Sequence, residues 1–102
     1  MPFVYLLSCS DGSLYCGWST DLERRIATHQ DGKGGRYTAT RRPVRLAIAW
    51  ETATNTQARS LEGRIKRLDV RRKRALVAGT PLEEVLDLKD PVHPVNSGRS
   101  PS

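Results

Sequence analysis

The sequence predicts an α+β fold with a small three-stranded, mostly antiparallel sheet flanked by helices, in the order strand, strand, helix, strand, helix, helix. Three observations support this prediction. Two short apolar segments rich in aromatic and branched residues flank an Asp-Gly turn. A third segment alternates apolar with charged residues, and apolar side chains recur at helical spacing in the segments around it.

The first two strands are predicted over residues 3–9 (FVYLLSC) and 13–18 (SLYCGW) as a hairpin. A two-residue turn would place Tyr5 and Tyr15 on opposite faces of this hairpin. A three-residue loop, Ser10-Asp11-Gly12, with its glycine in the left-handed conformation, places both tyrosines on one face. We predict the three-residue loop.

A first helix is predicted from about Asp21 to Gln30, because residues 20–23 (TDLE) fit a capping box and apolar residues then recur at helical spacing. The segment that follows, residues 31–43 (DGKGGRYTATRRP), is polar, contains glycines and carries four basic residues. It is predicted to be a long loop.

A third strand with one buried face is predicted over residues 44–51 (VRLAIAWE), in which Val44, Leu46, Ile48 and Trp50 alternate against Arg45 and Glu51. A second capping box at residues 54–57 opens a helix that ends near Asp69. Its predicted apolar stripe consists of Ala58, Leu61, Ile65 and Leu68. A short helix over about residues 70–78 closes at Gly79.

Two segments differ in composition. Residues 1–79 hold all the predicted elements named so far and form one domain, whereas residues 80–102 form a short acidic tail. Within this tail, residues 82–88 are predicted to form one or two helical turns. The remainder, residues 90–102 (DPVHPVNSGRSPS), is rich in proline, serine and glycine and is predicted to be disordered.

The net charge of +6 is unevenly distributed along the 102 residues. Residues 1–78 carry 15 basic and 7 acidic side chains, and residues 79–102 carry 2 basic and 4 acidic ones. A basic excess of this size in a small domain attracts polyanions, which makes nucleic acid the leading partner class. The alternative is a solvated surface that only keeps the protein soluble.

The cysteines and the apolar segments indicate where in the cell the protein is located. Cys9 and Cys16 both lie in apolar segments, so buried reduced thiols are expected rather than a disulfide. No charged leader precedes an apolar stretch, and no apolar run approaches the roughly 18 residues that span a bilayer. We therefore expect a cytoplasmic protein that does not enter a membrane.

Candidate site residues lie on the hairpin and the first helix. Tyr5 and Tyr15 have an ordinary explanation as strand core residues, but Gly17, two residues after Tyr15, indicates a close approach of backbone or ligand. Arg25 and His29 are four residues apart and so share one helix face. The alternative for His29 is a hydrogen-bonded residue at the edge of the core.

Glu62 borders the apolar stripe of the second helix. It has two interpretations: an ion pair with Arg59, Lys66 or Arg25, or a hard oxygen ligand for magnesium. Basic side chains follow it on most faces of two short helices and are predicted to contact phosphates. These residues are Arg64, Lys66, Arg67, Arg71, Arg72, Lys73 and Arg74.

Together these residues resemble the GIY-YIG nuclease superfamily, and most closely its small stand-alone bacterial members. The matching segments are Val4-Tyr5, Tyr15-Cys16-Gly17, residues 21–25 with His29, Tyr37-Thr38, Pro43-Val44, and Glu62 with Ile65-Lys66. Arg25 follows the second tyrosine by ten residues and His29 by fourteen, as in the family pattern. The resemblance makes residues 1–79 a GIY-YIG-like nuclease domain.

The resemblance implies hydrolysis of phosphodiester bonds with one divalent metal, Mg²⁺ or its substitute Mn²⁺. Tyr5 is then the general base, Tyr15 positions the water or shares its proton, Arg25 holds the phosphate, His29 orients Tyr5 or the phosphate, and Glu62 holds the metal. Because tyrosine has a pKa near 10, we expect positive charge from Arg25, His29 and the metal to lower the pKa of Tyr5.

We expect DNA as the first candidate substrate and a structure-specific role in DNA repair or recombination. The alternatives are a nucleic-acid-binding module that does not cut, and a subunit that recruits a repair or replication protein. The residues expected to contact nucleic acid are Arg24, Lys33, Arg36, Tyr37, Arg41, Arg42, Lys66, Arg71, Arg72 and Lys73.

Overall fold

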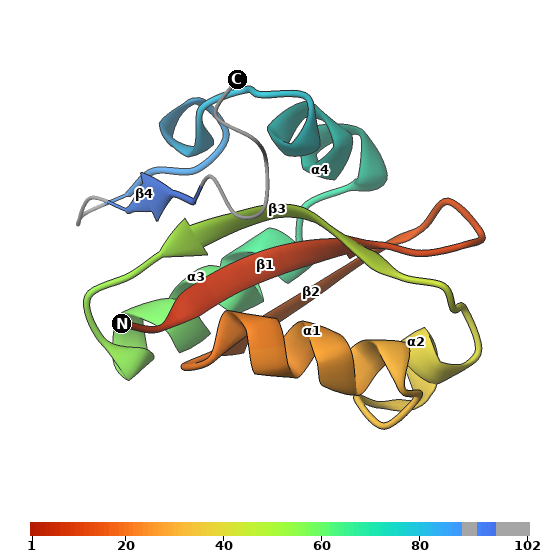
Figure 1. The fold of residues 1–102 in the computed structure, drawn as a ribbon. Coiled ribbons are helices and arrows are strands. Elements are labelled where there is room, and N and C mark those ends of the chain that lie inside the picture. Colours follow the sequence, from red (N-terminus) through yellow and green to blue (C-terminus); the bar gives the residue numbers. More distant parts are fainter. Residues whose placement is uncertain (89–91, 96–102) are drawn as a thin grey trace, which may run out of the picture.

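The computed structural model describes residues 1–88 and 92–95 of the protein (Figure 1). Four strands form one antiparallel sheet in the order β2-β1-β3-β4, so β1 is enclosed between two neighbours. The strands are β1 (Phe3–Ser8), β2 (Leu14–Ser19), β3 (Arg45–Glu51) and β4 (His93–Pro94). The helices are α1 (Leu22–Gln30), α2 (Arg36–Ala39), α3 (Asn55–Lys66), α4 (Val70–Val77) and the 3₁₀ helix η1 (Leu82–Glu84). The α+β class is confirmed.

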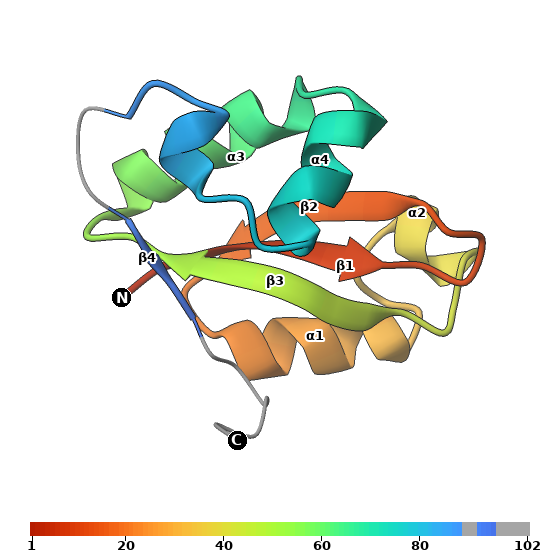
Figure 2. The ribbon, with the colours of Figure 1, turned by 90° about the horizontal axis from the view of Figure 1, so that it is seen from above.

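The sheet lies between two layers of helix. Figure 2 shows α1 on one face of the sheet and α3 and α4 on the other. Each face has its own core. The face toward α3 buries Val4, Leu6, Cys16, Trp50, Ala58, Leu61, Ile65, Leu76 and Leu82, and the face toward α1 buries Tyr5, Leu7, Cys9, Leu22, Val44 and Ala49. No helix of the described segments is long and apolar enough to span a bilayer.

The hairpin has the predicted three-residue loop. The backbone N–H of Cys9 donates to the carbonyl of Ser13 over 2.9 Å, and Gly12 has a φ of 85°. In this register Tyr5 pairs with Gly17 and Leu7 pairs with Tyr15. Since paired residues project to the same side of a sheet, both tyrosines point toward α1, as predicted.

The helix starts follow local capping rules, with one difference from the prediction. The carboxylate of Asp21, rather than the hydroxyl of Thr20, accepts the capping hydrogen bond of α1 from the backbone of Arg24. The Ser19 hydroxyl bonds the backbone of Asp21 in the turn that precedes the helix. Thr54 caps α3 as predicted.

The prediction of one buried face on β3 is wrong. Leu6 pairs with Ile48 whereas Leu7 pairs with Leu46, so Ala47 is an extra residue that forms a β-bulge. The bulge reverses the alternation, because Leu46 packs on the α1 side while Ile48 and Trp50 pack on the α3 side. Both faces of the sheet are covered, so the strand has no solvent face to keep polar.

Two segments predicted to lack regular structure contain short elements. The predicted loop over residues 31–43 includes the one-turn helix α2, whose Thr38 is buried. The predicted disordered tail includes β4, which pairs with the end of β3 and makes the sheet four-stranded instead of three-stranded. The rest of that tail, residues 90, 91 and 96–102, lies outside the described residues. Tertiary contacts rather than local propensity account for both elements.

Candidate active site

The structure brings four of the predicted site residues together on the α1 side of the sheet. Tyr5 comes from β1, Tyr15 from β2, and Arg25 and His29 from α1. The Tyr5 hydroxyl lies 3.0 Å from His29 Nε2 in a buried hydrogen bond. The rings of Tyr15 and His29 meet edge to face with centroids 5.2 Å apart. Helical spacing and the hairpin register together account for this arrangement.

Thr38 belongs to the same cluster, although the sequence prediction gave it no role. Its Oγ1 lies 2.8 Å from His29 Nδ1, and Thr38, His29 and Tyr5 all have no exposed surface. Both ring nitrogens of the imidazole are therefore occupied. Thr38 matches the family pattern but has no predicted place in the site, because it lies in a segment without periodicity and only the packing of α2 on α1 brings it to the histidine.

Two glycines permit the close packing of these rings. A Cβ at Gly17 would lie 2.5 Å from the Tyr5 hydroxyl oxygen, and a Cβ at Gly34 would lie 2.2 Å from His29 Nδ1. Neither distance is sterically acceptable. The glycine within the second strand predicts a close approach of backbone or ligand, but the group that approaches it is the side chain of Tyr5.

Arg25 is the cation of the cluster. Its guanidinium donates to the backbone carbonyl of Gly34 over 3.3 Å, and the residue is half-buried. Burial raises the pKa of Tyr5 above its ordinary value of 10.0, and the hydrogen-bonding and charge of Arg25 only partly oppose this. Burial, assisted by Arg25, lowers the pKa of His29 below its ordinary 6.5. His29 is therefore neutral at pH 7.

These electrostatics correct the expectation about Tyr5. The predicted lowering of its pKa by Arg25 and His29 is not found in the protein alone, because burial outweighs Arg25 and a neutral His29 contributes no charge. The cluster thus holds a neutral phenol and a neutral imidazole beside one guanidinium.

A stack of side chains extends the cluster toward solvent. The ring of Tyr37 stacks on that of Tyr15 at 5.7 Å, and the Arg41 guanidinium lies 3.9 Å from the centre of the Tyr37 ring. Asp11 in the hairpin loop holds Arg41 through a 3.0 Å ion pair. Since Tyr37 is 38% exposed, an aromatic and cationic surface continues from the buried site to the outside.

Glu62 lies apart from these four residues, on the helix that covers the opposite face. Its backbone carbonyl accepts a hydrogen bond from Cys16 Sγ at 3.8 Å, which places this turn of α3 against β2. Its carboxylate is 3.6 Å from Lys66 Nζ, so the predicted ion pair is present. Within the described residues, no hydrogen bond or ion pair joins that carboxylate to the clustered four.

Within the part of the chain that the structure describes, few side chains that could bind a metal ion lie close together. In residues 1–88 and 92–95, no group of three or more His, Cys, Asp or Glu side chains is placed to hold a metal ion. Mg²⁺ commonly takes one or two carboxylates and completes its shell with water and substrate phosphates. Glu62, with a side chain that is 21% exposed, fits a metal of that kind.

The residues expected to contact nucleic acid fall into two groups. Arg24, Lys33, Arg36, Tyr37, Arg41 and Arg42 belong to α1, α2 and their flanking segments, whereas Lys66, Arg71, Arg72 and Lys73 belong to α3 and α4. The sheet separates α1 from α3 and α4 (Figure 2). In the first group, Tyr37 stacks on Tyr15 of the cluster, and Arg41 lies on the Tyr37 ring.

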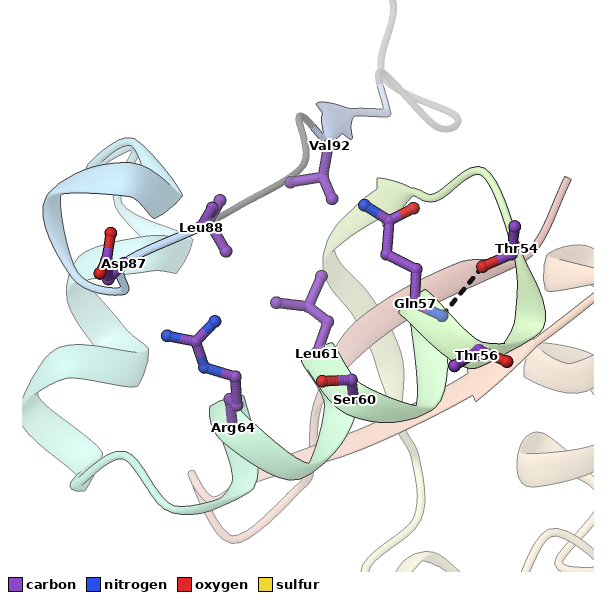
Figure 3. A pocket seen from close by; sticks show the side chains of 9 residues that line it. All are labelled: Thr54, Thr56, Gln57, Ser60, Leu61, Arg64, Asp87, Leu88 and Val92. Carbon is purple, nitrogen blue, oxygen red and sulfur yellow. Dashed lines mark hydrogen bonds between the residues drawn. The ribbon is translucent and has the colours of Figure 1, made fainter.

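One pocket lies on the α3 side of the sheet. Figure 3 shows it between α3 and the segment near Asp87 and Val92, lined by Thr54, Thr56, Gln57, Ser60, Leu61, Arg64, Asp87, Leu88 and Val92. None of the clustered aromatic or histidine side chains reaches it.

The sequence of this chain is similar to one family profile and to several known proteins. The sequence profile of the GIY-YIG catalytic domain matches residues 1–75. The UPF0213 protein BH0048 of Halalkalibacterium halodurans is 42% identical over 88 residues, which cover 84% of this chain and 94% of that protein. The UPF0213 protein YazA of Bacillus subtilis is 40% identical over 91 residues, or 89% of this chain and 87% of YazA.

One solved structure is similar over nearly the whole chain. The solution NMR structure of the UPF0213 protein BH0048 from Bacillus halodurans aligns with a TM-score of 0.51 at 40% identity. The alignment covers 89% of this chain and all of the other.

Proposed function

Because this chain belongs to the GIY-YIG family, whose catalytic domain is a nuclease domain, we propose that it is a metal-dependent endonuclease that hydrolyses phosphodiester bonds, with DNA as its substrate. The observation that carries the proposal is the buried hydrogen bond between Tyr5 and His29 beside Arg25. Burying a phenol and an imidazole together beside a half-buried guanidinium costs free energy that a purely structural core would avoid.

Each clustered side chain has a role that its position supports. Arg25 binds non-bridging phosphate oxygens, since its planar guanidinium offers several donors in a site partly shielded from water. Tyr5 first loses its phenol proton to solvent, and the resulting phenolate accepts the proton of the attacking water. Tyr15 positions that water, and neutral His29 orients the Tyr5 oxygen. When bound at Glu62, magnesium or manganese would neutralise the charge that develops on the leaving oxygen.

The surface around the site supports a polyanionic substrate. Tyr37 and Arg41 extend from the cluster to solvent, where an aromatic ring and a guanidinium suit a base and a phosphate. The proposal includes a structure-specific role in DNA repair or recombination, with a repair or replication protein as partner. It also includes a cytoplasmic location, which the two free buried cysteines favour.

Cleavage of labelled nucleic acids tests the proposal. Duplex, nicked, flapped and branched DNA, with matching RNA, would be incubated with Mg²⁺, Mn²⁺ or EDTA. We expect metal-dependent cuts, and a rate lower by about a hundredfold or more in Arg25→Ala and in Glu62→Gln. Arg45→Ala and Glu84→Gln change the same charges at exposed positions outside the cluster and control for charge alone. Full activity in folded Arg25→Ala and Glu62→Gln would refute the site assignment.

A second candidate function is a binding module that does not cut. The raised pKa of Tyr5 favours it, because a phenol of raised pKa is a poor base at neutral pH. Salt-sensitive binding across all substrates, without metal-dependent cleavage of any, would support this function. In that case Arg25→Ala weakens binding and Tyr5→Phe leaves it unchanged.

A further inference from the structure

We propose that Thr38 is a positioning residue that holds His29 in the tautomer protonated on Nε2, so that His29 donates its hydrogen bond to the Tyr5 oxygen. The consequence for cleavage rests on the proposed nuclease function. The tautomer itself does not, because it is a property of the folded protein.

Two hydrogen bonds link three side chains in a row, and each side chain comes from a different helix or strand. Thr38 Oγ1 is 2.8 Å from His29 Nδ1, and His29 Nε2 is 3.0 Å from the Tyr5 oxygen. All three residues are fully buried, and among the described residues Thr38 Oγ1 makes this one side-chain hydrogen bond. The two partners of the imidazole therefore decide which of its nitrogens carries the proton.

Counting the hydrogens of the three groups shows which atom is the donor in each of the two hydrogen bonds. Neutral Tyr5, His29 and Thr38 carry three hydrogens between them, but only two hydrogen bonds join them. If Tyr5 gives up its proton, one hydrogen remains for each bond. Both bonds then run in the same direction, from Thr38 to Nδ1 and from Nε2 to the Tyr5 oxygen. The opposite tautomer would direct the Nε2 lone pair at a phenolate.

Before Tyr5 loses its proton, one of two buried hydroxyl hydrogens, that of Thr38 or that of Tyr5, is left outside the two hydrogen bonds. If Thr38 only accepted from Nδ1, its own hydroxyl hydrogen would be buried without a partner, which is unfavourable. Tyr5 lies at the other end, beside Arg25, where the substrate phosphate is proposed to bind. The surplus hydrogen of the resting state therefore belongs to Tyr5, because of the two buried hydroxyls only that of Tyr5 lies where a phosphate oxygen is proposed to accept it.

The charge state of His29 is consistent with this arrangement. An imidazolium donates from both nitrogens and would not accept from Thr38, whereas burial and Arg25 keep His29 neutral. The charged and titratable groups around the ring are Tyr5 on β1, Tyr15 on β2 and Arg25 on α1. None of these groups is a carboxylate, so among these neighbours no carboxylate competes with Thr38 for the hydrogen bond at Nδ1.

Nitrogen-15 NMR of the labelled protein at pH 7.5 tests the tautomer without a substrate. The chain has two histidines, so His93→Gln identifies the signals of His29. We expect the shifts of a protonated Nε2 and an unprotonated Nδ1. Observation of a protonated Nδ1 in the wild-type protein would overturn the proposal, whether or not the protein cuts nucleic acid.

Three variants test the part played by Thr38. Thr38→Val removes the hydroxyl at nearly constant volume, and we expect loss of the pure Nε2-protonated form. Thr38→Ser restores a hydroxyl and should restore that form. Thr28→Val makes the same change one residue before His29, where the hydroxyl bonds only a backbone carbonyl, and should leave the histidine signals unchanged.

Kinetics then test the consequence for cleavage. We expect kcat of Thr38→Val to fall roughly tenfold to a hundredfold with an unchanged KM, and Thr38→Ser to recover most of the rate. An unchanged kcat in Thr38→Val, in a wild-type background that cuts, would refute the positioning role. If the wild-type protein does not cut, the proposed function fails, while the NMR result still decides the tautomer.

Discussion

The two faces of the sheet bury different kinds of side chain. The face toward α3 and α4 buries aliphatic side chains, Trp50 and the thiol of Cys16. The face toward α1 also has an apolar core, but Tyr5, His29 and Thr38 are buried there as a hydrogen-bonded group. Only Thr52, among the described residues, is another buried polar side chain.

This difference separates stability from function. Apolar burial on the α3 side stabilises the fold wherever shape and volume are kept. The polar group on the α1 side adds little net stability, because each of its hydrogen bonds replaces one with water. It does, however, fix the orientation of the groups proposed to act on a phosphodiester. Substitutions on the two faces should therefore have different effects.

The largest expected effect is on stability, at the α3 face. Leu6→Ala removes a fully buried side chain from the central strand and should lower the free energy of unfolding by about 2–5 kcal/mol. Denaturant titration measures this loss. At temperatures where the variant is still folded, its cleavage rate per folded molecule should equal that of the wild type, and a specific rate loss would contradict the separation of the faces.

Gly34→Ala should have an intermediate effect at the α1 face. The new methyl group would lie 2.2 Å from His29 Nδ1, so the ring must move away from Thr38. We expect a destabilisation of about 1–3 kcal/mol from overpacking and a loss of cleavage larger than the unfolded fraction explains. Histidine NMR signals measured alongside cleavage would show the displacement; unshifted signals would disagree with the steric argument.

The pH dependence of stability should also distinguish the faces. Because the pKa of folded His29 lies below 6.5, the unfolded chain binds a proton that the folded protein does not. The stabilisation is complete above pH 6.5 and is lost as the pH falls from 6.5 through the folded pKa. Unfolding midpoints between pH 8 and 5 should show the decrease, while His29→Gln removes it and His93→Gln keeps it.

The smallest effect is expected at Gly63, a glycine within α3. A Cβ there meets nothing within 4 Å, and its backbone needs no positive φ. Gly63→Ala should therefore raise stability by about 0.5–1 kcal/mol through the lower entropy of the unfolded chain. Thermal unfolding measures the gain, and cleavage should not change. A destabilised Gly63→Ala would mean that α3 lies closer to its neighbours than the contacts indicate.

Much of the site could be predicted from local sequence. The spacing of Arg25 and His29 is a property of any α-helix, and the three-residue loop at Gly12 decides which face both tyrosines share. These are short-range rules, so they hold before the chain packs. The same is true of the caps at Thr54 and Asp69.

Other features arise only when distant segments meet. The bulge at Ala47, the pairing of β4 with β3 and the helix α2 leave no periodic signal, because each depends on a surface that another element supplies. Thr38 contacts His29 only because α2 packs on α1. Burial raises the pKa of Tyr5, whereas the prediction from the sequence was a lowered pKa. Local spacing in the sequence thus determined which side chains share a face, whereas burial and long-range contacts determined the protonation and the hydrogen-bond partners of these side chains.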